Sequence, residues 1–344
     1  MEEGKTALRT AKKLAGSKLS PPLPMGQPSV ATPSDARGSD TEALRHVRER
    51  IRTLVGIAAA NESTMSADEL RVLLPRERFG DADAVVRFIE EDYALRDELV
   101  VNDGEVAPRA DTALVARRRD QRTLTRDRVA LARGFAASLV RFSPWTELVA
   151  VSGSVAYGGT KLDDDIDFFV VTPRRRLWIT LLIALGLARL NRARHPRAPV
   201  FCFNRLEETE RCESGFREAR EPLFAREALN LRILHGSEFY HDLLAASPWM
   251  ETWFPSLYRM RLDESAREPG AERDPRGTQW AAANALAFLV LGPYLWIVGA
   301  LRNSRLRREG RNAARFRTVI EPGFCAYESQ KYDDLGDAYR RTFT

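Results

Sequence analysis

The chain has 344 residues, of which 44% are hydrophobic and 29% charged, and its formal net charge is +5. This length suits two domains of roughly 100–200 residues each, and the composition is that of a globular protein with a core. The three cysteines and four histidines form no disulfide framework, no HExxH motif and no zinc-ligand spacing, which argues against those classes. The positive charge comes mainly from arginine and is weak evidence for a nucleic-acid partner.

Residues 1–40 are predicted to be a disordered tail. They are rich in Pro, Ser, Gly and Ala and contain few large apolar residues, so folding could not offset the loss of chain entropy. The tail also lacks the apolar run of a secretory signal. A cytoplasmic location is therefore expected.

Residues 41–107 have the pattern of a winged-helix-like module. Helices are expected at 41–60, from Ser66, which forms a capping-box pattern with Glu69, and at 81–95. A hairpin is expected around the turn Asn102-Asp103-Gly104. Between Asp68 and Asp103 the sequence has eleven acidic residues and five arginines, and such a surface repels a phosphate backbone. DNA binding by this module is therefore not expected.

Residues 108–142 predict a basic connecting helix with nine arginines and three aspartates. Its apolar positions Leu124, Leu131, Phe135 and Leu139 recur at helical spacing. The arginines form either a solvated face with Arg–Asp pairs or a basic strip beside an active cleft that holds a polyanionic substrate.

A glycine- and aspartate-rich segment joins two predicted strands, Leu148–Val151 and Ile166–Val171. Gly153-Ser154 follows the first strand, where glycine allows close backbone approach and serine donates to phosphate oxygens. Asp165 and Asp167 flank the start of the second strand, whose period of two places both carboxylates on one side. Two adjacent carboxylates repel unless a hard cation such as Mg²⁺ lies between them. The neighbouring Asp163 and Asp164 are expected to be solvated loop residues.

This arrangement resembles the DNA-polymerase-β-type nucleotidyltransferase superfamily. The resemblance implies that Asp165 and Asp167 hold Mg²⁺, with Mn²⁺ as a substitute, and that Gly153 and Ser154 contact the phosphates of an NTP. More narrowly, the chain resembles a group of uncharacterised prokaryotic proteins with a nucleotidyltransferase-like domain behind a winged-helix-like module.

The third carboxylate of that superfamily is not evident. On the predicted strand within 198–206, its expected place is taken by Cys202 and Asn204, a pair that the resemblance implies is a trait of the narrower group. Asn204 and Glu227 are the candidates for the third position, and Glu207 and Glu208 are weaker substitutes.

The predicted nucleotidyltransferase-like domain spans 143–260, and a helical C-terminal region is expected over 261–344. A helix at 174–194 is expected to pack on the sheet. Residues 280–301 predict an apolar helix that either contacts a membrane or is buried in the protein. An aromatic cluster, Trp249, Trp253, Phe254 and Tyr258, is expected to serve packing.

The predicted fold class is α+β, with a mixed nucleotidyltransferase-type sheet and flanking helices. The first functional hypothesis is Mg²⁺-dependent transfer of an NMP from an NTP to an unknown hydroxyl acceptor. The alternative is a catalytically weakened fold that binds a nucleotide or a protein as a regulatory module. Peripheral membrane association through 280–301 is compatible with either hypothesis.

Overall fold

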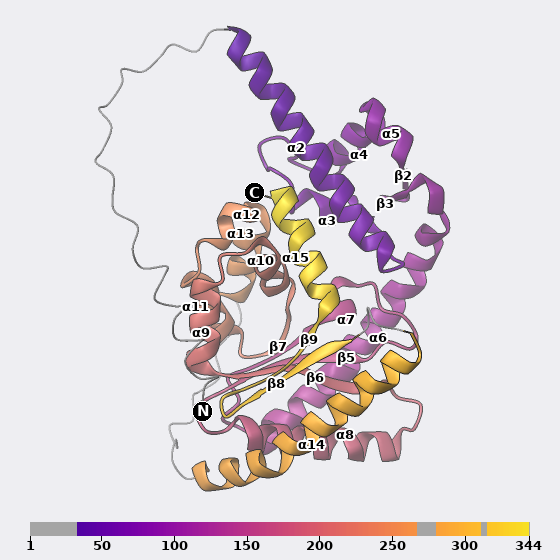
Figure 1. Cartoon of the computed structure of the whole chain (residues 1–344). Helices are drawn as coiled ribbons and strands as arrows, with labels where there is room; N and C mark the ends of the chain where they lie inside the picture. The colour runs from indigo at the N-terminus through magenta and orange to yellow at the C-terminus, as the bar shows by residue number, and fades with distance from the viewer. Residues whose placement is uncertain (1–32, 267–279, 311–314, 344) are drawn as a thin grey trace, which may run out of the picture. The chain divides into compact units, whose positions relative to one another are not determined.

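The computed structural model describes residues 33–266, 280–310 and 315–343 (Figure 1). The chain divides into two units, Met1–Leu44 and Arg45–Thr344, and every contact given below lies within the second. Most of the predicted tail lies outside the described residues, but residues 33–40 belong to helix α2 (Pro33–Ala60), which corrects that prediction. Proline is well suited to a first helical turn, and extending an existing helix costs little.

The N-terminal part of the second unit contains short helices and a three-stranded antiparallel sheet, ordered β1-β3-β2. After α2 the elements are β1 (Met65–Ser66), α3 (Ala67–Arg71), α4 (Ala82–Glu91), α5 (Tyr93–Glu98), β2 (Leu99–Asn102), β3 (Glu105–Pro108) and the 3₁₀ helix η2 (Arg109–Asp111).

The local predictions for this part are largely confirmed. Ser66 and Glu69 form the capping box of α3. The hairpin β2–β3 turns through Asp103 and Gly104, both with positive φ. The single helix expected over 81–95 is instead two helices, because the Asp92 side chain accepts a hydrogen bond from Leu95 N and begins α5.

The predicted connecting helix is one unbroken helix, α6 (Ala113–Phe142). The sequence predicted that its arginines form either a solvated face or a basic strip beside a cleft. Two of them do neither, since they are buried and bind other segments of the chain. Arg118 is 3% exposed and donates to Glu69 at 2.7 Å and to Ser63 at 3.1 Å. Arg128 donates to the carbonyl of Leu162 at 2.7 Å. These contacts attach the N-terminal elements and the 158–165 loop to α6.

Replacing Arg118 with Met is expected to destabilise the protein by about 2 kcal/mol, because Glu69 and Ser63 lose the donor that Arg118 provides. Urea unfolding at neutral pH measures this change. Arg117→Met on the same helix is the control, since Arg117 is exposed and its pair with Glu62 is long, at 3.8 Å. Equal stability of the two variants would contradict the structural role of Arg118.

A mixed six-stranded sheet, in the order β7-β4-β5-β6-β9-β8, forms the centre of the second unit. The strands are β4 (Leu148–Ser152), β5 (Ile166–Thr172), β6 (Phe201–Glu208), β7 (Arg232–His235), β8 (Phe316–Glu321) and β9 (Phe324–Ser329). Strands β5 and β6 are parallel, and all other neighbours are antiparallel. The chain is therefore an α+β protein with a mixed sheet, as predicted.

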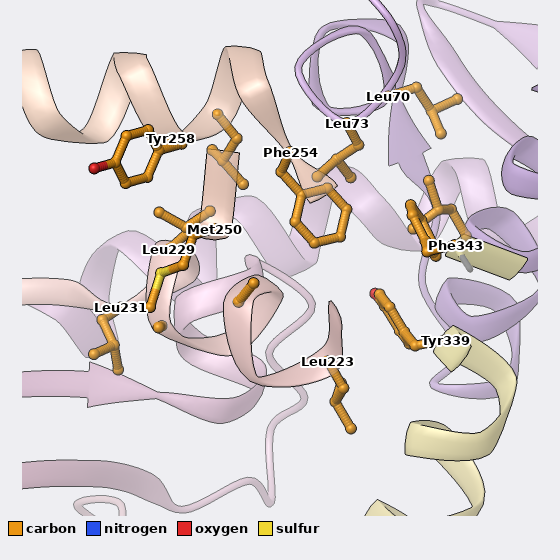
Figure 2. Packing of buried hydrophobic residues seen from close by; sticks show 14 of the residues in the cluster. Leu70, Leu73, Leu223, Leu229, Leu231, Met250, Phe254, Tyr258, Tyr339 and Phe343 are labelled. Carbon is orange, nitrogen blue, oxygen red and sulfur yellow. The ribbon is translucent and has the colours of Figure 1, made fainter. Parts of the chain in front are cut away.

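Helices cover both faces of this sheet. Helix α6, α8 (Leu177–Arg194) and α14 (Ala281–Arg308) share one core with Val151, Ile166 and Phe168. A second core joins the N-terminal helices to Ala150, Phe169 and six of the helices after β6. Those helices are α9 (Thr209–Glu218), α10 (Pro222–Asn230), α11 (Ser237–Ala245), α12 (Met250–Trp253), α13 (Pro255–Ser265) and α15 (Gln330–Phe343). Figure 2 shows part of this core, with Leu70 and Leu73 from the N-terminal part and Phe254 and Phe343 from the part after β6. Phe254 and Tyr258 are buried in this core, which confirms the packing role of the aromatic cluster.

The prediction of a helical region over 261–344 is wrong in one respect, since β8 and β9 lie within it and extend the sheet. Leu206 pairs with Cys325 in the register of β6 and β9. The run Phe324–Ser329 is short and alternates little, and its strand character depends on pairing with β6, a long-range contact. The predicted helix at 280–301 is present as α14, which continues to Arg308 and passes through Pro293.

Candidate functional site

The fold brings Gly153-Ser154 and the two aspartates together at one end of the β4–β5 pair. The two strands are antiparallel, and Ser152 pairs directly with Asp167. Gly153 therefore begins the short helix α7 (Gly153–Tyr157) beside Asp167, while Asp165 directly precedes β5. The predicted candidates from both halves of the motif are neighbours in the structure.

Gly153 meets a backbone and a packing requirement at once. Its φ is +63°, in the left-handed region that L residues with a Cβ rarely adopt. A Cβ at this position would overlap Oδ2 of Asp167. Glycine is thus needed for the carboxylate of Asp167 to lie against the turn.

The electrostatics of the two aspartates are unfavourable without a cation. Burial, together with the charges of Asp165 and Asp164, raises the pKa of Asp167 from 3.8 to about 7. Burial and the charge of Asp164 also raise the pKa of Asp165, whereas Arg302 lowers it. A divalent cation bound between the carboxylates would remove this cost.

Asn204, a candidate for the third position, contacts Asp167 directly. Its Nδ2 donates to Oδ1 of Asp167 at 2.6 Å. The register of β5 and β6 passes from Phe168↔Phe203 to Phe169↔Arg205, so Asn204 is the extra residue of a β-bulge. A bulge redirects a side chain relative to the regular strand. The Sγ of Cys202 lies 3.0 Å from Oδ1 of Asn204.

The glutamates considered for the third position lie elsewhere. Glu207 and Glu208 pair with Val171 and Thr172 at the opposite end of β5 from Asp167, and Glu208 accepts from Arg175 N. Glu227, on α10, accepts from Tyr157 Oη at 2.8 Å and is partly buried. Of these candidates, only Asn204 has a recorded contact with the aspartates.

Replacing Asn204 with Asp is expected to tighten Mg²⁺ binding by about tenfold or more, because a third carboxylate then faces the pair. Asn204→Ala is expected to weaken binding, since Asp167 loses the amide that holds it. Isothermal titration with Mg²⁺ measures both affinities. Glu208→Gln, at the far end of β6, is the control and should leave the affinity unchanged. Weaker binding by Asn204→Asp would contradict a cation at this position.

A cavity of about 610 Å³ opens beside Gly153 and Ser154. Its lining includes the cations Lys161, Arg226 and Arg232 and also the carboxylates of Glu69, Asp164 and Glu227. Residues of α2 form its other wall. Arg226 is 6% exposed, and within the described residues its Nε and the Nδ2 of Asn230 have no hydrogen-bond partner. Buried donors without partners next to cations are suited to an anionic ligand.

A second cavity, of about 340 Å³, contains Asp165, Asp167 and Asn204. Its remaining walls are mainly apolar and include Leu181 and Leu185 from α8 and Leu295 and Val298 from α14. Arg302 of α14 lies in the same wall, and its charge lowers the pKa of both aspartates. Ser329 lines both cavities, so the two spaces are adjacent.

The donor set fits Mg²⁺ in kind, with two carboxylates and one amide from adjacent strands. No group of three or more His, Cys, Asp or Glu side chains arranged for a metal is present in the part of the chain that the structure describes. The cation would therefore complete its shell with water or ligand oxygens, as Mg²⁺ usually does.

The sequence did not identify Arg226, Arg232 or Arg302 as site residues. Each reaches the cavities from an element far along the chain, and nothing local distinguishes it from the many other arginines. Comparison with protein-family models, with curated proteins and with solved structures gives no match for this chain.

Proposed function

We propose that the protein transfers a nucleotidyl group from an NTP to a hydroxyl acceptor. The observation that carries the proposal is the shared edge of β4 and β5, where Gly153 leaves room for the partly buried carboxylate of Asp167 between two adjacent cavities. This site and its mixed sheet agree with the resemblance to the DNA-polymerase-β-type nucleotidyltransferases.

In this proposal the larger cavity takes the nucleotide. Gly153 and Ser154 donate backbone and hydroxyl groups to phosphate oxygens, and Arg226 and Arg232 balance the phosphate charge. Asp165 and Asp167 hold Mg²⁺, which when bound neutralises charge on the transferring phosphoryl group and leaving pyrophosphate. Asn204 positions Asp167.

The smaller cavity takes the acceptor. It reaches the same two aspartates, so an acceptor hydroxyl there would face the nucleotide across the carboxylates. Its apolar walls support an acceptor that carries an apolar group next to its hydroxyl.

The test is label transfer from each of four α-labelled NTPs with Mg²⁺, with pyrophosphate release measured in parallel. Asp165→Ala and Asp167→Ala are each expected to lower transfer by at least about 10³-fold, since the cation contributes several kcal/mol to the transition state. Asp163→Ala, an exposed loop variant, is the control. Transfer that persists in both site variants would disprove the proposal.

The second candidate is a regulatory module that binds Mg²⁺ and a nucleotide without turnover. The observation in its favour concerns Asn204, which stands where the resemblance implies a third carboxylate. Asn204 instead donates a hydrogen bond to Asp167. Tight NTP binding without label transfer, even with cell extract as a source of acceptors, would favour this candidate.

The N-terminal elements support the finer interpretation of a winged-helix-like module. They follow the order helix α2, strand β1, helices α3, α4 and α5, and hairpin β2–β3. We propose that this module closes the nucleotide cavity rather than binding DNA. Asn61, at the end of α2, accepts from Lys331 at 2.7 Å, and Glu62 pairs with Lys161 at 3.2 Å. Both lysines line that cavity.

A further inference from the structure

The outer face of α14 is strongly apolar and exposed. Leu286, Leu289 and Trp296 are 64%, 68% and 63% exposed, values that are high for large apolar side chains. The outer face, as we define it, comprises Leu286, Leu289, Val290, Tyr294, Trp296, Ile297, Val298 and Leu301. These side chains are between 40% and 68% exposed.

The opposite face of α14 is committed to the protein. Leu291 and Leu295 are buried, and Asn284 accepts hydrogen bonds from the backbone N–H groups of Trp178 and Ile179 at the start of α8. Gly299 lies so close to β8 that a Cβ would overlap Thr318. Helix α14 has the length and composition of a membrane span, which is weak evidence alone, and this packing leaves only one face for lipid.

The charges around the outer face select the kind of partner. Helices α8 and α14 lie side by side (Figure 1) and contain seven arginines and no acidic residue. Arg302, Arg305, Arg307 and Arg308 occupy the end of α14 after the apolar segment, and Arg305 pairs with Glu309 at 2.8 Å. Arg189 donates to the hydroxyl of Tyr294 at the edge of the outer face. An apolar strip with aromatic residues and flanking arginines is complementary to an anionic lipid surface.

We propose that α14 lies in the interface of an anionic lipid bilayer, with its outer face inserted and its inner face packed on the protein. A second copy of this chain would bring two arginine-rich surfaces together, which charge repulsion disfavours. Val298 belongs both to the outer face and to the acceptor cavity. If the proposed function holds, the acceptor hydroxyl is therefore carried by an amphiphile that enters from the bilayer.

The test is flotation of the full chain with phosphatidylcholine vesicles, with and without a fraction of phosphatidylglycerol. The protein is expected to bind the anionic vesicles and to be released by high salt. Leu289→Asp and Trp296→Asp are each expected to weaken vesicle binding at least about tenfold. Each replaces an apolar side chain that would be buried in the lipid of the bound state with a charged one. Both positions are exposed, so the variants should fold.

Tyr93→Asp is the matched control, since Tyr93 is equally exposed but belongs to α5 of the N-terminal part. Asp167→Asn should bind vesicles as the wild type does, whether or not the protein transfers nucleotides, which separates this inference from the proposed function. Absence of vesicle binding would overturn the inference. A concentration-dependent dimer that the outer-face variants abolish would also overturn it, because the outer face would then bind a second copy. Resistance of the bound protein to extraction by alkaline carbonate would overturn it too, because that result indicates a helix that spans the bilayer.

Discussion

Asp167→Asn is expected to make the metal-free protein more stable above pH 7 and to abolish the proposed nucleotidyl transfer. The pKa of Asp167 is raised from 3.8 to about 7 in the folded protein. Between these pH values the folded state binds more protons than the unfolded state, so stability falls as the pH rises through that window and stays reduced above it. Asparagine removes this penalty, which is about 4 kcal/mol at most. Its side-chain oxygen can still accept from Asn204.

Thermal unfolding at pH 5 and pH 8, each with EDTA or with Mg²⁺, measures the effect. With EDTA at pH 8 the variant is expected to melt several degrees above the wild type, and the difference should shrink at pH 5. Mg²⁺ should stabilise the wild type and leave the variant unchanged. Asp163→Asn removes one exposed carboxylate and serves as the control. A lower melting temperature for Asp167→Asn than for the wild type at pH 8 in EDTA would contradict the claim that the charged carboxylate of Asp167 destabilises the folded protein.

Gly153→Ala is expected to weaken the proposed Mg²⁺ binding and to lower the proposed transfer by about 10²-fold, because the new methyl group displaces the carboxylate of Asp167. The left-handed backbone, at φ +63°, adds a stability cost of about 1–2 kcal/mol. Calorimetric titration with Mg²⁺ detects the change even if no acceptor is known.

Gly158→Ala separates the two causes. Gly158 also has a left-handed φ, +73°, but a Cβ there would meet the guanidinium of Arg118 at an ordinary 3.5 Å. This variant should lose similar stability and keep its Mg²⁺ affinity. Equal loss of affinity in both variants would mean that backbone strain, and not contact with Asp167, sets the requirement at Gly153.

Much of the local structure was predictable from the sequence. The capping box at Ser66, the hairpin at Asp103-Gly104, helix α6 and strands β4, β5 and β6 depend on short-range periodicity and turn chemistry. That Gly153 and Asp167 share one site was expected only from the resemblance, and the antiparallel pairing of β4 and β5 brings them together.

The long-range parts were not predictable. Strands β8 and β9 are short, and their pairing with β6 brings Phe324 opposite Glu207 across a separation that no local pattern encodes. The same holds for the environment of the aspartates. Arg302 reaches them only because α14 packs beside α8, and Asn204 meets Asp167 only because a bulge forms in β6.

Residue type and a strand period of two are enough to mark Gly153-Ser154 and Asp165-Ile166-Asp167 as residues that can carry chemistry. Their environment comes from the packing of distant segments. Burial raises the pKa of Asp167, α2 and α10 form the walls of the larger cavity, and α14 closes the smaller one while leaving its outer face exposed. Burial and cavity walls are sums over distant segments, so they exist only after the segments have packed.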